Sequence, residues 1–108
     1  IIVKVGTGYQ QLSTREIELV EAHNKYVTFF MTDGREIKVS EPLYSFEERL
    51  GVHEGFYKTH RSYIVAIPHV DYFDLNKVTT KSQHIAYIAR GMGKQFRYAY
   101  FAYMFQEK

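Results

Sequence analysis

A short polar turn in the second half of the chain carries the residues best suited to chemistry. His60, Arg61 and Ser62 stand between two aromatic and β-branched segments, residues 56–58 and 63–67. An arginine fork can donate to O6 and N7 of guanine together, and serine hydroxyls and backbone N–H groups bind phosphates. The turn therefore favours nucleic-acid binding. The competing interpretations are a surface ion pair for Arg61 and, for His60, a core histidine bonded to backbone carbonyls.

Catalysis is a second use of such side chains, and the spacing argues against it. The histidines form no HExxH pair and no other metal-ligand spacing; they are His23, His53, His60, His69 and His84. Ser62 lies in no Gly-x-Ser-x-Gly elbow. The two Gly-x-Gly segments, at 6–8 and 91–93, lack the lysine of a phosphate-binding loop and the βαβ setting of a dinucleotide site. We expect no enzyme, no metal and no cofactor.

The composition is that of one small folded domain, residues 1–108, that is rich in strands. Ten tyrosines and eight phenylalanines among 108 residues favour β-structure. No cysteine is present, which fits a reducing compartment such as the cytoplasm. No apolar run approaches the roughly 20 residues that span a bilayer. The chain opens on Ile1 without a methionine, which suggests a piece of a longer protein.

Charge is distributed unevenly along the chain. Residues 1–54 contain six basic and nine acidic residues, a net charge of −3, whereas residues 55–100 contain seven basic and two acidic residues, a net charge of +5. A basic half beside an acidic half suggests one face built for an anion, or else chance clustering of ordinary surface charge.

Hydrophobic alternation and turn residues predict ten strand segments and two helices. The strands are expected at 1–5, 10–13, 17–22, 26–31, 36–39, 56–58, 63–67, 70–74, 77–80 and 84–89. Asp33-Gly34 predicts a hairpin turn. A short amphipathic helix is expected over 40–51, because Leu43, Phe46 and Leu50 have helical spacing. A final helix is expected over 94–106.

The segment Lys58-Thr59-His60-Arg61-Ser62-Tyr63-Ile64-Val65 resembles the signature of the LytTR family, the output domains of bacterial response regulators. Other pieces resemble the family in order and spacing. They are residues 17–22 with Asn24-Lys25-Tyr26-Val27, the Asp33-Gly34 hairpin, the Leu43, Phe46 and Leu50 helix, and Ile88-Ala89-Arg90.

The resemblance implies a mainly β fold, an elongated stack of short antiparallel sheets with one short helix and a C-terminal helix. It implies sequence-specific binding to double-stranded DNA, with loops in successive major grooves of repeated promoter elements. It also implies a receiver domain ahead of this one. The family's contacts correspond to the loop His23, Asn24, Lys25 and Tyr26, to Arg61 and to Arg90. We assign Lys25, Lys58, Ser62 and Lys94 to phosphates.

The sequence departs from the family pattern at three places. Ala66 stands where asparagine is common, and Ala89 replaces the usual serine before Arg90. Gly91 and Gly93 predict a loose junction before the last helix, so that Arg90 would become ordered only on binding.

The last helix supports a different hypothesis. Its inward stripe is expected to contain Phe96, Ala99, Tyr100, Tyr103 and Met104, which leaves three aromatic residues, Tyr98, Phe101 and Phe105, off that stripe. They could pack sideways on the domain, or they could contact a second protomer as a homodimer on DNA or the receiver domain. The alternative function is thus a small β module for protein–protein or membrane-surface contact. Steep salt dependence would indicate DNA binding instead.

Overall fold

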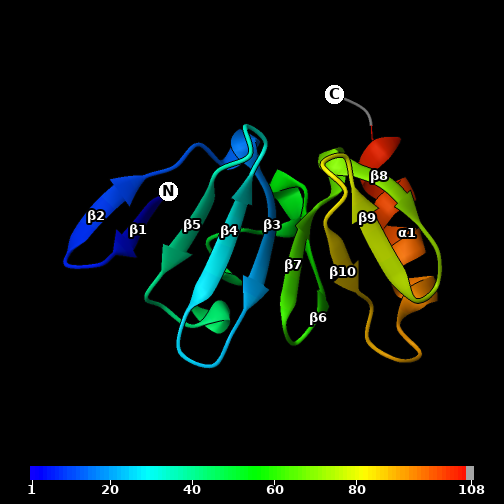
Figure 1. Cartoon of the computed structure of the whole chain (residues 1–108). Helices are drawn as coiled ribbons and strands as arrows, with labels where there is room; N and C mark the ends of the chain where they lie inside the picture. The colour runs from blue at the N-terminus through cyan, green and yellow to red at the C-terminus, as the bar shows by residue number, and fades with distance from the viewer. Residues whose placement is uncertain (107–108) are drawn as a thin grey trace.

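The computed structural model describes residues 1–106 and contains three antiparallel sheets and one α-helix (Figure 1). The expectation of a mainly β fold is confirmed. The strands are β1 (Ile2–Val5), β2 (Gly8–Gln11), β3 (Ile17–Ala22), β4 (Val27–Met31), β5 (Glu36–Val39), β6 (Phe56–His60), β7 (Tyr63–Ala66), β8 (Val70–Phe73), β9 (Lys77–Thr80) and β10 (Ile85–Tyr87). The helix α1 spans Gly93–Met104.

The sheets follow one another along the longest dimension of the molecule, which measures 40 Å. β1 and β2 form a hairpin at one end. The central sheet has the order β5-β4-β3-β7-β6, and the last sheet has the order β10-β9-β8. Helix α1 packs on the last sheet at the other end (Figure 1). This arrangement is the elongated stack that the resemblance implied.

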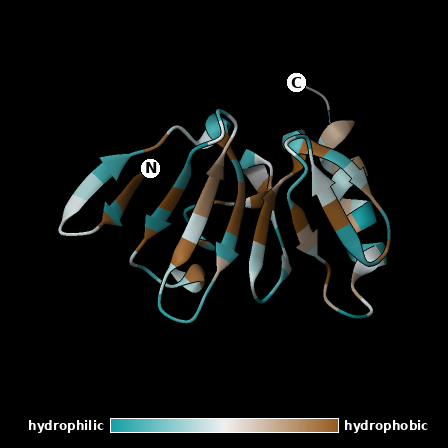
Figure 2. Ribbon diagram, in the orientation of Figure 1, coloured by the Kyte–Doolittle hydropathy of each residue, from teal (hydrophilic) through white to brown (hydrophobic). Residues whose placement is uncertain are grey.

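β3 is buried on both faces because it lies between two hydrophobic cores. Ile17 and Val20 belong to the core that includes β4, β5 and β1, whereas Leu19 belongs to the core that includes β9, β10 and α1. Ile17 and Val20 share a side despite their odd spacing, because a bulge between Ile17 and Leu19 shifts the register. Figure 2 shows hydrophobic residues along the strands of the central sheet and a hydrophilic β3–β4 loop.

The residue in that bulge, Glu18, is a buried carboxylate that sequence reasoning did not single out. Only 1% of Glu18 is exposed. Its two oxygens accept hydrogen bonds from the backbone N–H and the hydroxyl of Ser82, at 3.1 and 2.9 Å. A buried charge is tolerated only where such donors replace water. Glu18 therefore fastens the central sheet to the β9–β10 turn.

Two helical expectations need correction. The helix expected over 40–51 is a single 3₁₀ turn, Leu43–Phe46, with no side-chain cap at its start. Leu43, Phe46 and Leu50 are nevertheless all buried, as their spacing predicted. In α1, Phe96 is buried, but Met104 is 47% exposed and does not belong to the inward stripe. No helix among residues 1–106 is long and apolar enough to cross a membrane.

Candidate nucleic-acid interface

Three loops that are distant in the sequence lie along one edge of the molecule. They connect β3 to β4, β6 to β7, and β10 to α1, and all three lie at the lower edge in Figure 1. We call segments 23–26, 60–62 and 88–92 the loop edge. The signature turn and the two other segments that the family resemblance indicated are thus brought to one side of the fold.

Backbone and side-chain hydrogen bonds join the three loops to one another. The N–H of Ala22 donates to the carbonyl of Ser62 at 2.8 Å, which links the first loop to the second. The N–H of Ala89 donates to the carbonyl of Thr59, also at 2.8 Å. The buried Thr59 hydroxyl donates to the carbonyl of Tyr87 at 2.9 Å, which links the second loop to the third. The spacing of the loops is therefore set before any ligand arrives.

In the first loop, Tyr26 supports its neighbours. The His23 and Tyr26 rings stack with centroids 4.6 Å apart, and the His23 N–H donates to the Tyr26 carbonyl at 2.8 Å. The ammonium of Lys38 lies 4.2 Å from the centre of the Tyr26 ring. His23, Asn24 and Lys25 are exposed, whereas Tyr26 is half-buried. The first three residues can reach a ligand, and Tyr26 holds the loop in shape.

The second loop presents Arg61 at its tip. Arg61 is exposed and forms no ion pair with any carboxylate of residues 1–106. His60 is half-buried, and its Nδ1 accepts a hydrogen bond from the Ser62 N–H at 3.1 Å. The interpretation that both ring nitrogens of His60 bond to backbone carbonyls is therefore wrong for Nδ1. This nitrogen accepts a hydrogen bond, so it cannot donate one to a carbonyl oxygen. That contact occupies the Ser62 N–H and leaves the Ser62 hydroxyl for other partners.

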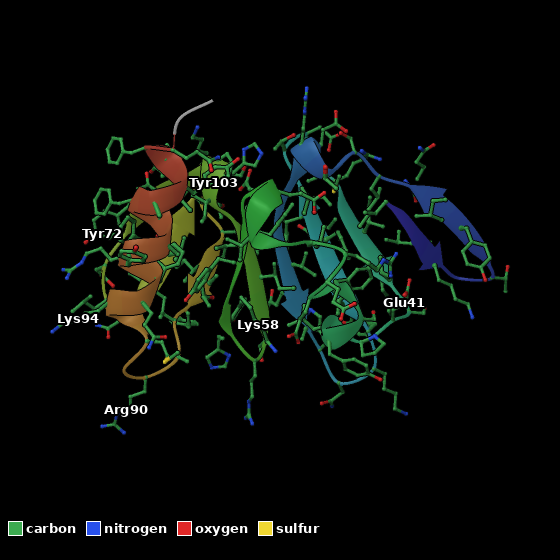
Figure 3. The ribbon with its side chains drawn as sticks, turned by 180° about the vertical axis from the view of Figure 1, so that it is seen from behind. Glu41, Lys58, Tyr72, Arg90, Lys94 and Tyr103 are labelled. Atoms are coloured by element: carbon green, nitrogen blue, oxygen red, sulfur yellow. The ribbon has the colours of Figure 1, made fainter. Side chains whose placement is uncertain are left out.

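The third loop presents Arg90, which is exposed and extends away from the body of the domain (Figure 3). The junction behind it is closely packed at Gly93 and open at Gly91. Gly91 adopts a φ of +81°, which favours glycine. Gly93 is buried, and a β-carbon there would lie 2.4 Å from the carbonyl oxygen of Leu75. The second glycine thus lets the start of α1 pack directly on the β8–β9 turn, which fixes the base of the Arg90 loop.

Lys58 and Lys94 occupy different settings, both shown in Figure 3. The Lys58 ammonium lies 2.6 Å from a Glu47 carboxylate oxygen, with both side chains 39% exposed. Lys94 is exposed on the first turn of α1, whose N-terminus has no side-chain cap. A helix N-terminus carries partial positive charge, so Lys94 adds to an existing positive potential.

An aromatic row runs beside the second loop. The Tyr63 ring contacts His60 and Tyr87, with centroid separations of 5.7 and 6.2 Å. Burial raises the pKa of the Tyr63 hydroxyl, and the nearby Glu21 carboxylate raises this pKa further. The hydroxyl is therefore neutral at physiological pH and can donate a hydrogen bond. Sequence reasoning missed Thr59 and Tyr87 as residues of this edge, because β10 pairs with β9 and only the fold brings it beside β6.

Comparison with known proteins agrees with this architecture. The family model of the LytTr DNA-binding domain matches residues 8–100. Among solved structures, the chain is similar to the LytTr DNA-binding domain of a response regulator from Bacillus cereus. That similarity has a TM-score of 0.74 and 17% sequence identity, over 92% of this chain and 94% of the other. No curated protein sequence matches the chain.

The chain therefore belongs to the LytTR family of DNA-binding domains.

Proposed function

We propose that this domain binds specific sequences in double-stranded DNA, with the loop edge facing successive major grooves of repeated promoter elements. The observation that carries the proposal is the joining of three loops, two of them tipped by exposed arginines that form no ion pair with the described residues, 1–106. The 40 Å length of the domain is comparable with one turn of B-DNA, about 34 Å. Loops distributed along that length can reach grooves on one side of the duplex.

Arg61 and Arg90 are the proposed base readers. Each arginine lies on a short loop that hydrogen bonds join to its neighbours, so the entropy cost of ordering the loop on binding is small. The guanidinium group can make a bidentate contact with guanine. His23 and Asn24 are proposed to read or border the neighbouring groove. Tyr26 acts by stacking on His23.

Four residues are proposed to hold phosphates: Lys25, Lys58, Ser62 and Lys94. Lys25 and Lys94 are exposed, so their ammonium groups can contact a phosphate directly. Lys58 would exchange Glu47 for a phosphate, which costs little because exposed ion pairs contribute only about 0–1 kcal/mol. Ser62 would use its hydroxyl, since its N–H is bonded to His60.

The wider setting is also proposed. As an output domain of a cytoplasmic two-component regulator, this domain would follow a receiver domain and would bind paired sites as a homodimer. Three exposed aromatic residues support a protein contact: Tyr98 and Phe101 on α1 and Phe105 directly after it are 78%, 46% and 75% exposed. The same observation favours a second candidate function, a β module that binds a protein or a membrane surface through α1.

A salt titration separates the two functions. Oligonucleotides selected from a random pool would supply a specific site, and a scrambled site of equal composition would serve as the control. DNA binding through the loop edge predicts preference for the selected site and an affinity that falls steeply with salt, because phosphate contacts release counterions. Equal affinity for the two DNAs would rule out sequence-specific reading, and salt-independent association would favour the aromatic face of α1.

A further inference from the structure

Tyr87 lies between the two proposed base-reading arginines. It is the last residue of β10, three residues before Arg90, and its carbonyl accepts the hydrogen bond from Thr59. Thr59 is itself two residues before Arg61. The Tyr87 backbone is therefore held at a fixed distance from both arginine loops, while 53% of the residue remains exposed.

The Tyr87 side chain points to the outer face of the last sheet. Ala86 and Val78 face the core with Phe96 of α1. Side chains alternate along a strand, so Tyr87 and its register partner Lys77 lie on the opposite, solvent face. Directly paired residues on one face have β-carbons about 5 Å apart. The β-carbons of Tyr87 and Lys77 are thus side by side on this face, and the Tyr87 ring also lies 6.2 Å from the Tyr63 ring.

We propose that Tyr87 and Lys77 form a site for one DNA backbone phosphate, located between the grooves that Arg61 and Arg90 enter. The inference rests on the proposed function. When two loops enter neighbouring grooves, the sugar-phosphate backbone must pass between them, and Tyr87 occupies that interval. A tyrosine hydroxyl and a lysine ammonium are both donors that phosphates accept. The site positions the duplex and reads no bases.

The charged groups around the site determine where the phosphate would lie. Glu21 acts on Tyr63, on the side of Tyr87 that faces the central sheet. Its negative charge disfavours a phosphate there. On the other side, the Asp74 carboxylate accepts hydrogen bonds from the backbone N–H groups of Asn76 and Lys77 and also attracts the Lys77 ammonium, which a phosphate would have to share. The favourable position is therefore above Lys77 rather than above Tyr63.

The first test removes one oxygen atom. Tyr87→Phe keeps the ring that contacts Tyr63 and deletes the hydroxyl. We expect roughly tenfold weaker binding to the selected and the scrambled site alike, because hydrogen bonds to charged groups are the strong ones. The matched control is Tyr9→Phe, since Tyr9 is 75% exposed on β2, in the hairpin at the opposite end of the molecule. Equal affinities for the two variants would overturn the site.

The second test locates the phosphate. Duplexes that carry one neutral methylphosphonate at successive backbone positions are titrated with the wild-type domain, Tyr87→Phe and Lys77→Gln. At one position between the arginine contacts, the neutral linkage should weaken the wild type more than it weakens either variant, because each variant has already lost one of the two donors to that phosphate. Lys77→Gln should also reduce the salt slope by about one unit. Additive losses at every position would contradict the site.

The two failures are distinguishable. If the wild-type domain does not bind DNA or does not prefer the selected site, the proposed function fails. If it binds and discriminates but Tyr87→Phe behaves like Tyr9→Phe, only the phosphate site fails. Unchanged thermal unfolding of both tyrosine variants would show that the losses arise in binding.

Discussion

The loop edge and the outer face of α1 are the two regions for which we propose contacts with partners, and the two surfaces differ in chemistry and in construction. The loop edge is polar, its segments come from three parts of the chain, and hydrogen bonds join them. The outer face of α1 comes from one helix and exposes aromatic rings, two of which, Phe101 and Phe105, stack on each other at 5.8 Å. Binding at the first should depend on charge and salt, and binding at the second on apolar area.

The comparison is tested most strongly by the two arginines. Arg61→Ala and Arg90→Ala should each cost roughly 1–3 kcal/mol on the selected site and relax preference at one base position, because each loses a bidentate contact. Lys94→Ala is the matched control; it should weaken all sequences alike and reduce the salt slope by about one unit. Titrations on the selected and scrambled sites give these quantities. Equal losses on both DNAs would make the arginines anchors and leave specificity to the 23–26 loop or to DNA shape.

The second largest effect is expected at Gly93, where the Arg90 loop of the loop edge joins α1. Gly93→Ala places a methyl group 2.4 Å from the Leu75 carbonyl oxygen, so α1 must move. We expect a loss of about 1–3 kcal/mol in the free energy of unfolding, measured with urea, and weaker specific DNA binding through Arg90. Gly8→Ala is the control, because its β-carbon would meet only one atom, at 3.9 Å. A stable variant with unchanged affinity would mean that α1 and the Arg90 loop are independent.

A smaller effect on stability is expected from the aromatic face. Replacing Phe101 and Phe105 with serine should change the free energy of unfolding by no more than about 1 kcal/mol, since both rings are largely outside the core. Cooperative binding to paired sites should decrease, while binding to a single site should not. Tyr44→Ser, at a residue 74% exposed, is the control for a lost surface ring. If the double variant unfolds, the rings are part of the core.

The smallest effect is a pH dependence in the turn beneath Gly93. Backbone N–H groups of Asn76 and then Lys77 lower the pKa of Asp74. Because the folded pKa is lowered, the stability that Asp74 contributes is present above the unfolded value of about 3.9 and is lost as the pH falls through the folded pKa. Asp74→Asn should therefore be less stable than the wild type at neutral pH, and the difference should shrink in acid. Urea midpoints across that range would measure it, and a constant difference would contradict the assignment.

The sequence predicted the local structure well, because local patterns determine it. Alternating residues placed the strands, Asp33-Gly34 placed the β4–β5 turn, and the segment around Arg61 identified the family. What it could not show depends on distant partners. The burial of Glu18 requires Ser82, and the packing of Gly93 requires Leu75. In the same way, nothing in the sequence around Tyr87 indicates that β6 lies beside it.

The looseness expected of the junction was wrong at Gly93 for the same reason. Two glycines close together in a sequence indicate freedom only if nothing packs against them. Gly91 does adopt a turn conformation that favours glycine. Gly93 is a glycine because Leu75 leaves no room for a side chain. A glycine that suggested flexibility in the sequence is therefore required for close packing, because a residue from another part of the chain lies against it.

The central position of β3 also shapes how the chain must fold. One of its neighbours, β4, follows at once, but the other, β7, is synthesised much later, and the Glu18–Ser82 bonds close 64 residues. Such non-local closure slows folding, towards milliseconds or seconds for domains of this kind. Until β7 arrives, β3 has an open edge that can pair with the same edge of another chain. During synthesis, the strand that later joins the two cores is therefore open to aggregation until β7 has been made.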